Sequence, residues 1–151
     1  MPQSRPGRRV AIVAGIRTPF AKSGTAFRDV SAVALARHAA RELLFRSELD
    51  GREVDEVIFS QVVPSVLAPN VGREVSLLPQ LLPSVPAYTL NRACASSAQA
   101  VANAADQNAL GNADRGLWTT LAAIGLIGYG TILVFKAVYR ARKQGPLPGS
   151  E

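Results

Sequence analysis

Cys94 is the residue of this 151-residue chain best suited to covalent chemistry. It lies within Asn91–Ala100 (NRACASSAQA), after a short apolar stretch and at the start of an alanine-rich segment with helical character. The free N–H groups and the positive end of the dipole at a helix N-terminus stabilise a thiolate, and Arg92 adds a positive charge nearby. Because a thiolate attacks thioester carbonyls, this placement predicts an acyl-accepting nucleophile. Taken alone, a single cysteine is more often an inert buried residue, so the flanking residues must decide.

Other catalytic and ligand sets are missing from the sequence. One cysteine and one histidine cannot form a disulfide framework or a Cys/His metal site within one chain. The histidine, His38, lies in a predicted helix, where we expect an exposed or half-buried side chain rather than a catalytic base. The sequence also contains no P-loop and no zinc-ligand spacing. We therefore expect no metal and no bound cofactor.

The formal net charge of +6 is divided between the two parts of the chain. In the first part, basic residues alternate with acidic ones: Arg37, Arg41, Arg46 and Arg52 with Glu42, Glu48 and Asp50. Such alternation is typical of a solvated helix face. The sequence therefore indicates no nucleic-acid partner.

Apolar periodicity and turn residues predict alternating strands and helices up to about residue 110. Ser31 is suited to cap the first helix, which should extend to a break at Gly51. The predicted elements are strand 10–14 closing on Gly15, a helix between Ser31 and Gly51 with apolar spacing from Val33 to Leu44, strand 54–63, short helix 70–78, strand 88–91 and helix 96–110. The order β-α-β-α-β-α predicts an α/β fold with parallel neighbouring strands.

The segment 117–135 contains nineteen residues without a charge. As a helix it would be roughly 28 Å long, close to the thickness of the bilayer core. Trp118 and Tyr139 stand where interfacial anchors would, and a basic, Pro/Gly-rich tail follows. A buried core helix is the alternative. We predict a transmembrane helix, and hence four parts: a basic tail (1–8), a domain (9–115), the apolar helix (116–139) and a second basic tail (140–151).

The residues around Cys94 resemble the acyl-enzyme loop of the thiolases, especially that of the β-subunit of the fatty-acid oxidation trifunctional complexes. Three further stretches are similar to the same family. They are Arg9–Ala21 (RVAIVAGIRTPFA), Val54–Val63 (VDEVIFSQVV) and Asn70–Glu74 (NVGRE). The resemblance extends from about Arg8 to Asp114, with the motifs in the family's order.

The resemblance implies thiolytic cleavage of a 3-ketoacyl-CoA, or the reverse condensation, with coenzyme A thioesters as substrates. Cys94 would be the nucleophile, and its backbone N–H would be one donor to the acyl oxyanion. Asn91, Arg92 and Gln99 would position the loop without reacting. The implied partners are acyl-CoA or CoA and a thiolase subunit or second copy, with the membrane as a further partner through residues 117–135.

The departures from the family concern its second half. That half supplies the histidine that activates the cysteine, a second cysteine that acts as acid and base, and much of the CoA pocket. After Asp114 the family enters a core strand, where this chain has its apolar segment. We therefore expect an incomplete thiolase-like N-terminal half with an exposed sheet edge.

Three hypotheses remain open. The chain could be an acyltransferase fragment, whose activity alone should be low because catalytic groups act as a unit. It could be a membrane-tethered, non-catalytic partner of a full-length thiolase, with its domain on the cytoplasmic or matrix side. It could also be the product of a truncated or shifted reading frame.

Overall fold

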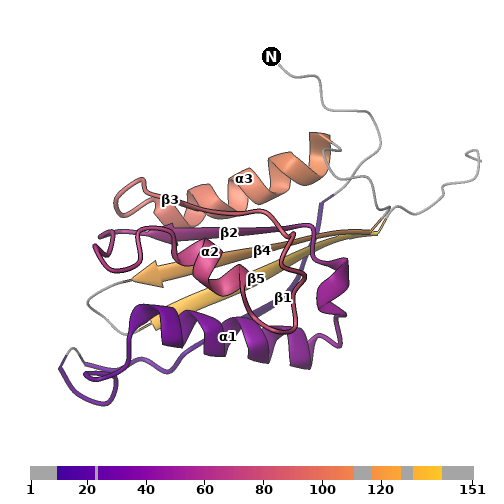
Figure 1. Cartoon of the computed structure of the whole chain (residues 1–151). Coiled ribbons are helices and arrows are strands. Elements are labelled where there is room, and N and C mark those ends of the chain that lie inside the picture. The colour runs from indigo at the N-terminus through magenta and orange to yellow at the C-terminus, as the bar shows by residue number, and fades with distance from the viewer. Residues whose placement is uncertain (1–9, 23, 111–116, 127–130, 141–151) are drawn as a thin grey trace, which may run out of the picture.

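The computed structural model describes residues 10–22, 24–110, 117–126 and 131–140, which form an α/β unit (Figure 1). In chain order its elements are β1 (Ile12–Arg17), α1 (Ala32–Arg46), the 3-10 turn η1 (Gly51–Glu53), β2 (Glu56–Gln61), α2 (Val71–Ser76), β3 (Ala87–Leu90), α3 (Ser96–Leu110), β4 (Leu117–Leu126) and β5 (Thr131–Arg140).

The strands form one mixed sheet in the order β1-β5-β4-β2-β3. β4 pairs with β2, and β2 with β3, in parallel, whereas β5 is antiparallel to both β4 and β1. Only β5 therefore runs against the direction of the other four strands. The carboxyl ends of β2 and β3 meet at the same edge, where side chains that follow the two strands can come together.

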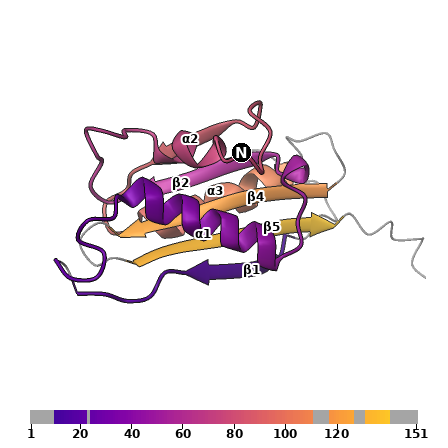
Figure 2. The same ribbon diagram turned by 60° about the horizontal axis from the view of Figure 1, so that its bottom comes forward.

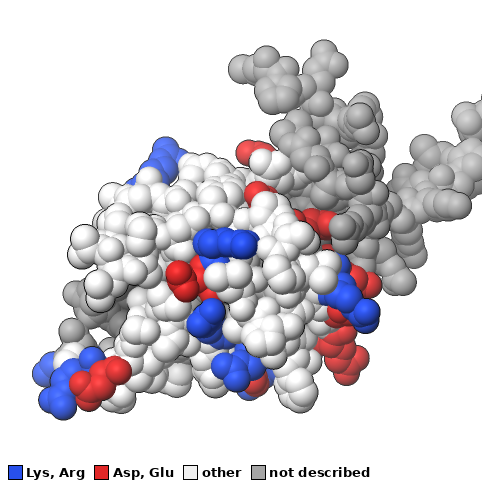
Figure 3. All heavy atoms as spheres, in the orientation of Figure 1, with Lys and Arg blue, Asp and Glu red and all other residues white. Residues whose placement is uncertain are grey.

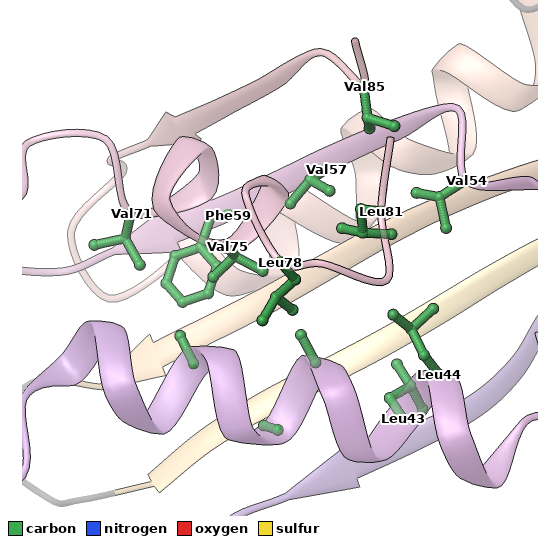
Figure 4. Packing of buried hydrophobic residues seen from close by; sticks show 13 residues of the cluster. Leu43, Leu44, Val54, Val57, Phe59, Val71, Val75, Leu78, Leu81 and Val85 are labelled. Carbon is green, nitrogen blue, oxygen red and sulfur yellow. The ribbon is translucent and has the colours of Figure 1, made fainter. Parts of the chain in front are cut away.

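Helices cover both faces of the sheet (Figures 1 and 2). Side chains of β2 alternate: Val57 and Phe59 pack against α1 and α2, whereas Ile58 packs against Ala100 and Ala104 of α3. Figure 4 shows the larger cluster, in which Leu43 and Leu44 of α1 lie beneath the side chains of β2 and α2. Both faces of β2 are buried, as expected for a central strand with parallel neighbours.

The predicted transmembrane helix is wrong. Residues 117–126 and 131–140 form the antiparallel strands β4 and β5, and no helix in the described part of the chain is long and apolar enough to cross a membrane. A strand buried on both faces is as free of charge as a membrane helix, so an uncharged run does not separate the two. β4 also supplies the core strand that we expected to be missing after Asp114.

The remaining predicted elements are confirmed, with changes at their ends. β1 begins at Ile12 and continues through Gly15 to Arg17, because pairing with β5 extends across the glycine. The Ser31 side chain caps α1 by accepting a hydrogen bond from the Ala34 N–H at 3.1 Å. Asn70 caps α2 in the same way, through the Arg73 N–H. The predicted tail 1–8 lies outside the described residues, as does the predicted tail 140–151 except for Arg140, which is the last residue of β5.

Charged side chains are interspersed on the face shown in Figure 3, where Lys and Arg lie beside Asp and Glu. Two ion pairs of the described residues are Arg46–Glu42, four residues apart on α1, and Arg52–Asp50, at the start of η1. The Arg52 guanidinium lowers the pKa of Asp50 by hydrogen bonding to its carboxylate. These exposed pairs agree with the solvated helix face expected from the sequence.

A proline in β4 tests the central position of this strand. Ala122 pairs with Ile58 of β2 on one side and with Phe135 of β5 on the other. Proline removes a ladder donor and leaves its acceptor unpaired, so we expect Ala122→Pro to lower the free energy of unfolding by about 1–3 kcal/mol. Urea denaturation followed by circular dichroism measures this. Val66→Pro, at an exposed loop position, is the control. An equal loss of stability in the two variants would contradict the central position of β4 in the sheet.

The carboxyl of Glu56 gives a pH-dependent prediction. Burial at the start of β2 raises the pKa of Glu56, so the folded state binds this proton more tightly than the unfolded state. The associated stability is present below the ordinary carboxyl pKa, about 4.3, and is lost as the pH rises through the higher pKa of the folded protein. We therefore expect Glu56→Gln to be more stable than wild type at pH 7, with the gain vanishing near pH 4.

Thermal unfolding at several pH values measures this effect, with Glu53→Gln, at an exposed position, as the control. A gain from Glu56→Gln that is the same at both ends of the pH range would show that burial of the charge is not its cause.

Candidate functional site

Cys94 is exposed in the turn between β3 and α3, two residues before the first residue of α3. The predicted placement at the start of a helix is therefore correct. The turn follows the carboxyl end of β3, the strand that lies beside β2 in the sheet. An exposed thiol here is accessible to a ligand that approaches this end of the sheet.

The residue before the cysteine has an unusual backbone. Ala93 has φ of 46°, in the left-handed region that residues with a Cβ seldom adopt. Such a conformation costs about 1–3 kcal/mol and persists only when the surrounding contacts hold it. Two side chains hold it here: Asn91 Oδ1 accepts from the Ala93 N–H at 3.0 Å, and Ser96 Oγ donates to the Ala93 carbonyl at 2.6 Å.

The same two side chains tie the turn to the end of β2. Asn91 Nδ2 donates to the Val62 carbonyl at 2.9 Å, and Ser96 Oγ lies 3.3 Å from the Gln61 carbonyl. Because β2 is buried in the middle of the sheet, its end is a rigid support. The position of Cys94 is thus set by contacts to β2 as well as by the chain on either side of it.

A chain of side-chain hydrogen bonds leads from the turn along α3. Arg92 donates to Gln99 Oε1, Gln99 donates to Asn103 Oδ1 at 2.7 Å, and Asn103 donates to the Tyr88 hydroxyl at 3.1 Å. Burial is the main cause of the raised pKa of Tyr88, and the nearby Glu56 raises it further. The phenol is therefore neutral at physiological pH and serves as a polar anchor on β3.

The helix α2 fixes β3 in front of the turn. The Thr89 hydroxyl accepts from the Gly72 N–H at 2.8 Å and donates to Asn70 Oδ1 at 2.9 Å. A Cβ at Gly72 would lie 2.5 Å from the Tyr88 carbonyl oxygen, so only glycine permits this approach. The motif Asn70–Glu74, noticed in the sequence, thus positions the strand that carries the turn.

The structure assembles most of the residues expected at the site. Asn91, Arg92 and Gln99 all form hydrogen bonds within or next to the turn, as a positioning role requires. His38 is exposed on α1, which covers the opposite face of the sheet from α3, and is not part of the site. In the described ranges, no group of three or more His, Cys, Asp or Glu residues could hold a metal ion.

Sequence reasoning missed two residues next to the turn. Ser96 is 1% exposed and lies three residues after Ala93, the residue with positive φ. The sequence does not mark this serine, because its role depends on a backbone conformation that only the structure reveals. Gln61 is 2% exposed at the end of β2, and its side-chain amide has no hydrogen-bond partner among the described residues. A buried amide without hydrogen-bond partners lowers the stability of the folded state.

The site as a whole presents one accessible thiol on a turn held by buried contacts. The helix α3 begins two residues after Cys94, at Ser96. A groove elsewhere on the surface, lined by Arg41, Phe45, Asp50 and Gln80, lies beside the end of α1 and includes no residue of the turn. The turn is therefore the best candidate for chemistry on this chain.

Comparison with known proteins gives consistent matches. The family model for the thiolase N-terminal domain matches residues 10–120, so the match extends into β4. A 3-ketoacyl-CoA thiolase of Shewanella pealeana is 46% identical over 111 residues, which cover 74% of this chain and 26% of that protein. The corresponding enzyme of Shewanella putrefaciens is also 46% identical over 111 residues. This chain thus spans about a quarter of the length of these relatives.

Solved structures of the same family have a similar fold. Human mitochondrial 3-ketoacyl-CoA thiolase, in complex with CoA, matches with a TM-score of 0.69 and 31% identity over 77% of this chain and 29% of that one. Bacillus anthracis acetyl-CoA acetyltransferase matches with a TM-score of 0.67 and 30% identity over 76% of this chain and 29% of that one. The family model covers well over half of the sequence and ends within β4. This chain therefore belongs to the thiolase family, of which it contains the N-terminal domain region.

Proposed function

We propose that Cys94 accepts an acyl group from a coenzyme A thioester, as one step of a 3-ketoacyl-CoA thiolase reaction or of the reverse condensation. The observation that carries this proposal is the exposed thiol of Cys94, on a left-handed turn fixed by Asn91 and Ser96 at the start of α3. The turn lies inside the stretch that matches the thiolase N-terminal domain. Coenzyme A thioesters as substrates imply a cytoplasmic or mitochondrial matrix location.

In the proposed step, the Cys94 thiolate attacks the thioester carbonyl of the acyl-CoA. A new C–S bond forms, the carbonyl oxygen becomes an oxyanion, and the C–S bond to CoA then breaks. The acyl group remains on Cys94 as a thioester, and the CoA thiolate takes up a proton. The backbone N–H of Cys94 is our proposed donor to the oxyanion.

The base that would activate Cys94 has no counterpart in the described part of this chain. His38, the only histidine of the sequence, belongs to α1 on the opposite face of the sheet. We therefore propose that groups outside the described residues complete the CoA site and supply this base. Acyl transfer by this chain alone should then be slow, because positioned base and substrate together contribute several orders of magnitude.

Acyl labelling tests the role of Cys94. We expect radiolabelled acetyl-CoA to label the folded wild-type chain and not Cys94→Ala, with label retained after denaturation and released by hydroxylamine. Ser97→Ala, which changes the neighbouring half-buried serine, is the matched control and should label like wild type.

A comparison with the unfolded chain separates site chemistry from ordinary thiol reactivity. We expect labelling in native buffer to be at least about tenfold faster than in urea, because the folded turn orients the thiol toward the acyl group. Absence of label from folded wild type, or equal rates in the two conditions, would refute the proposed function.

A further inference from the structure

Ser96 is the buried centre of the turn that carries Cys94. Its hydroxyl is enclosed, with the residue 1% exposed, whereas Asn91, Arg92, Ala93, Cys94 and Ala95 are all exposed. Ser96 Oγ accepts a hydrogen bond from the Arg92 N–H at 2.7 Å and donates to the Ala93 carbonyl at 2.6 Å. The Gln61 carbonyl lies at 3.3 Å from the same oxygen.

The proton of a hydroxyl serves one strong acceptor at a time. The shorter distance assigns it to the Ala93 carbonyl, so the Gln61 carbonyl is a weaker, second contact that joins the turn to β2. Ser96 therefore bonds to the peptide groups at both ends of the Arg92–Ala93 unit. Its neighbour Ser97 is half-buried and has no such contacts in the described structure.

The left-handed backbone of Ala93 lies between two held peptide groups. Asn91 Oδ1 binds the N–H that precedes the Ala93 Cα, and Ser96 Oγ binds the carbonyl that follows it. Relaxation of φ from 46° to a negative value would rotate one of these groups relative to the other and break a bond. The Ala93 carbonyl belongs to the peptide unit that contains the Cys94 N–H, so this rotation would also turn the N–H proposed as the oxyanion donor.

We propose that Ser96 is a positioning residue for acyl transfer to Cys94: its hydroxyl holds the Ala93–Cys94 peptide unit in the orientation that acylation requires. This inference rests on the function proposed for Cys94. Ser96 does not touch the acyl group. It acts by fixing the peptide unit of the nucleophile, and the Asn91 side chain fixes the preceding unit.

Four variants of the full chain test the proposal. Ser96→Ala removes the hydroxyl, and Ser97→Ala is the matched control. Ala93→Gly, added to Ser96→Ala, introduces a residue that adopts positive φ without strain. Asn91→Ala removes the hydrogen bond to the Ala93 N–H. Because Asn91 is exposed, this variant is less prone to unfold than Ser96→Ala. Three quantities are measured for each variant: the rate of acetylation by acetyl-CoA, the one-bond Cα–Hα coupling of residue 93 by NMR, and the midpoint of urea unfolding. The coupling separates positive from negative φ.

We expect Ser96→Ala to acetylate about tenfold more slowly than wild type, because a small misorientation of a reacting group has effects of this order or larger. The Ala93 coupling should shift toward negative φ in the same variant. In this background Ala93→Gly relieves the strain of the left-handed backbone and should recover part of the lost rate, whereas a purely structural role of Ser96 would leave every folded variant at the wild-type rate. Ser97→Ala should match wild type in rate and coupling.

A wild-type rate and coupling in folded Ser96→Ala would overturn the proposal. If Ser96→Ala does not fold, Asn91→Ala provides the test. A wild-type acetylation rate in Asn91→Ala, together with a shifted Ala93 coupling, would show that acylation does not need the left-handed turn. Ser96 would then have no positioning role. Failure of the proposed function is distinguishable, because wild type would then not acetylate at all, whatever the couplings of residue 93.

Discussion

The hydrogen bonding of β4 to β2 on one side and to β5 on the other joins the two parts of the sheet. Without β4, the pair β1–β5 would have no connection through the ladder to the pair β2–β3. Burial of β2 on both faces depends on this central place, and the turn of Cys94 depends in turn on β2, through the carbonyls of Gln61 and Val62. The geometry of the reactive thiol is therefore a property of the whole sheet, although the thiol itself lies on its surface.

The sequence predicts the α/β part well because its signals are local. Ser31 and Asn70 are capping residues at helix starts, and apolar spacing marks α1 and α3. The transmembrane helix predicted for residues 117–135 is wrong because an uncharged apolar run is compatible with a bilayer-spanning helix and with strands in the interior of a sheet. Within this run, the β-branched residues Thr119 and Thr120 favour a strand, and the glycines at positions 125, 128 and 130 disfavour a continuous helix.

At the site, the sequence predicts chemistry better than geometry. Cys94 before an alanine-rich helix, with Arg92 beside it, is recognisable from residue types alone, and the structure confirms this placement. The left-handed φ of Ala93 could not be predicted, because a non-glycine residue adopts it only where tertiary contacts impose it. The importance of Ser96 follows from that backbone conformation, so it too becomes visible only in three dimensions.

The pairing of β1 with β5 sets the order in which the chain can fold. Gly15 pairs with Phe135, which is separated from it by most of the sequence, and β1 has no other partner among the described strands. On the ribosome, the first strand must therefore wait for the last one, while the apolar edge of β2 stays uncovered until β4 emerges. Such non-local pairing raises the contact order, slows folding and prolongs the time during which the nascent chain can aggregate. Chaperones that shield uncovered strands should therefore raise the yield of this protein.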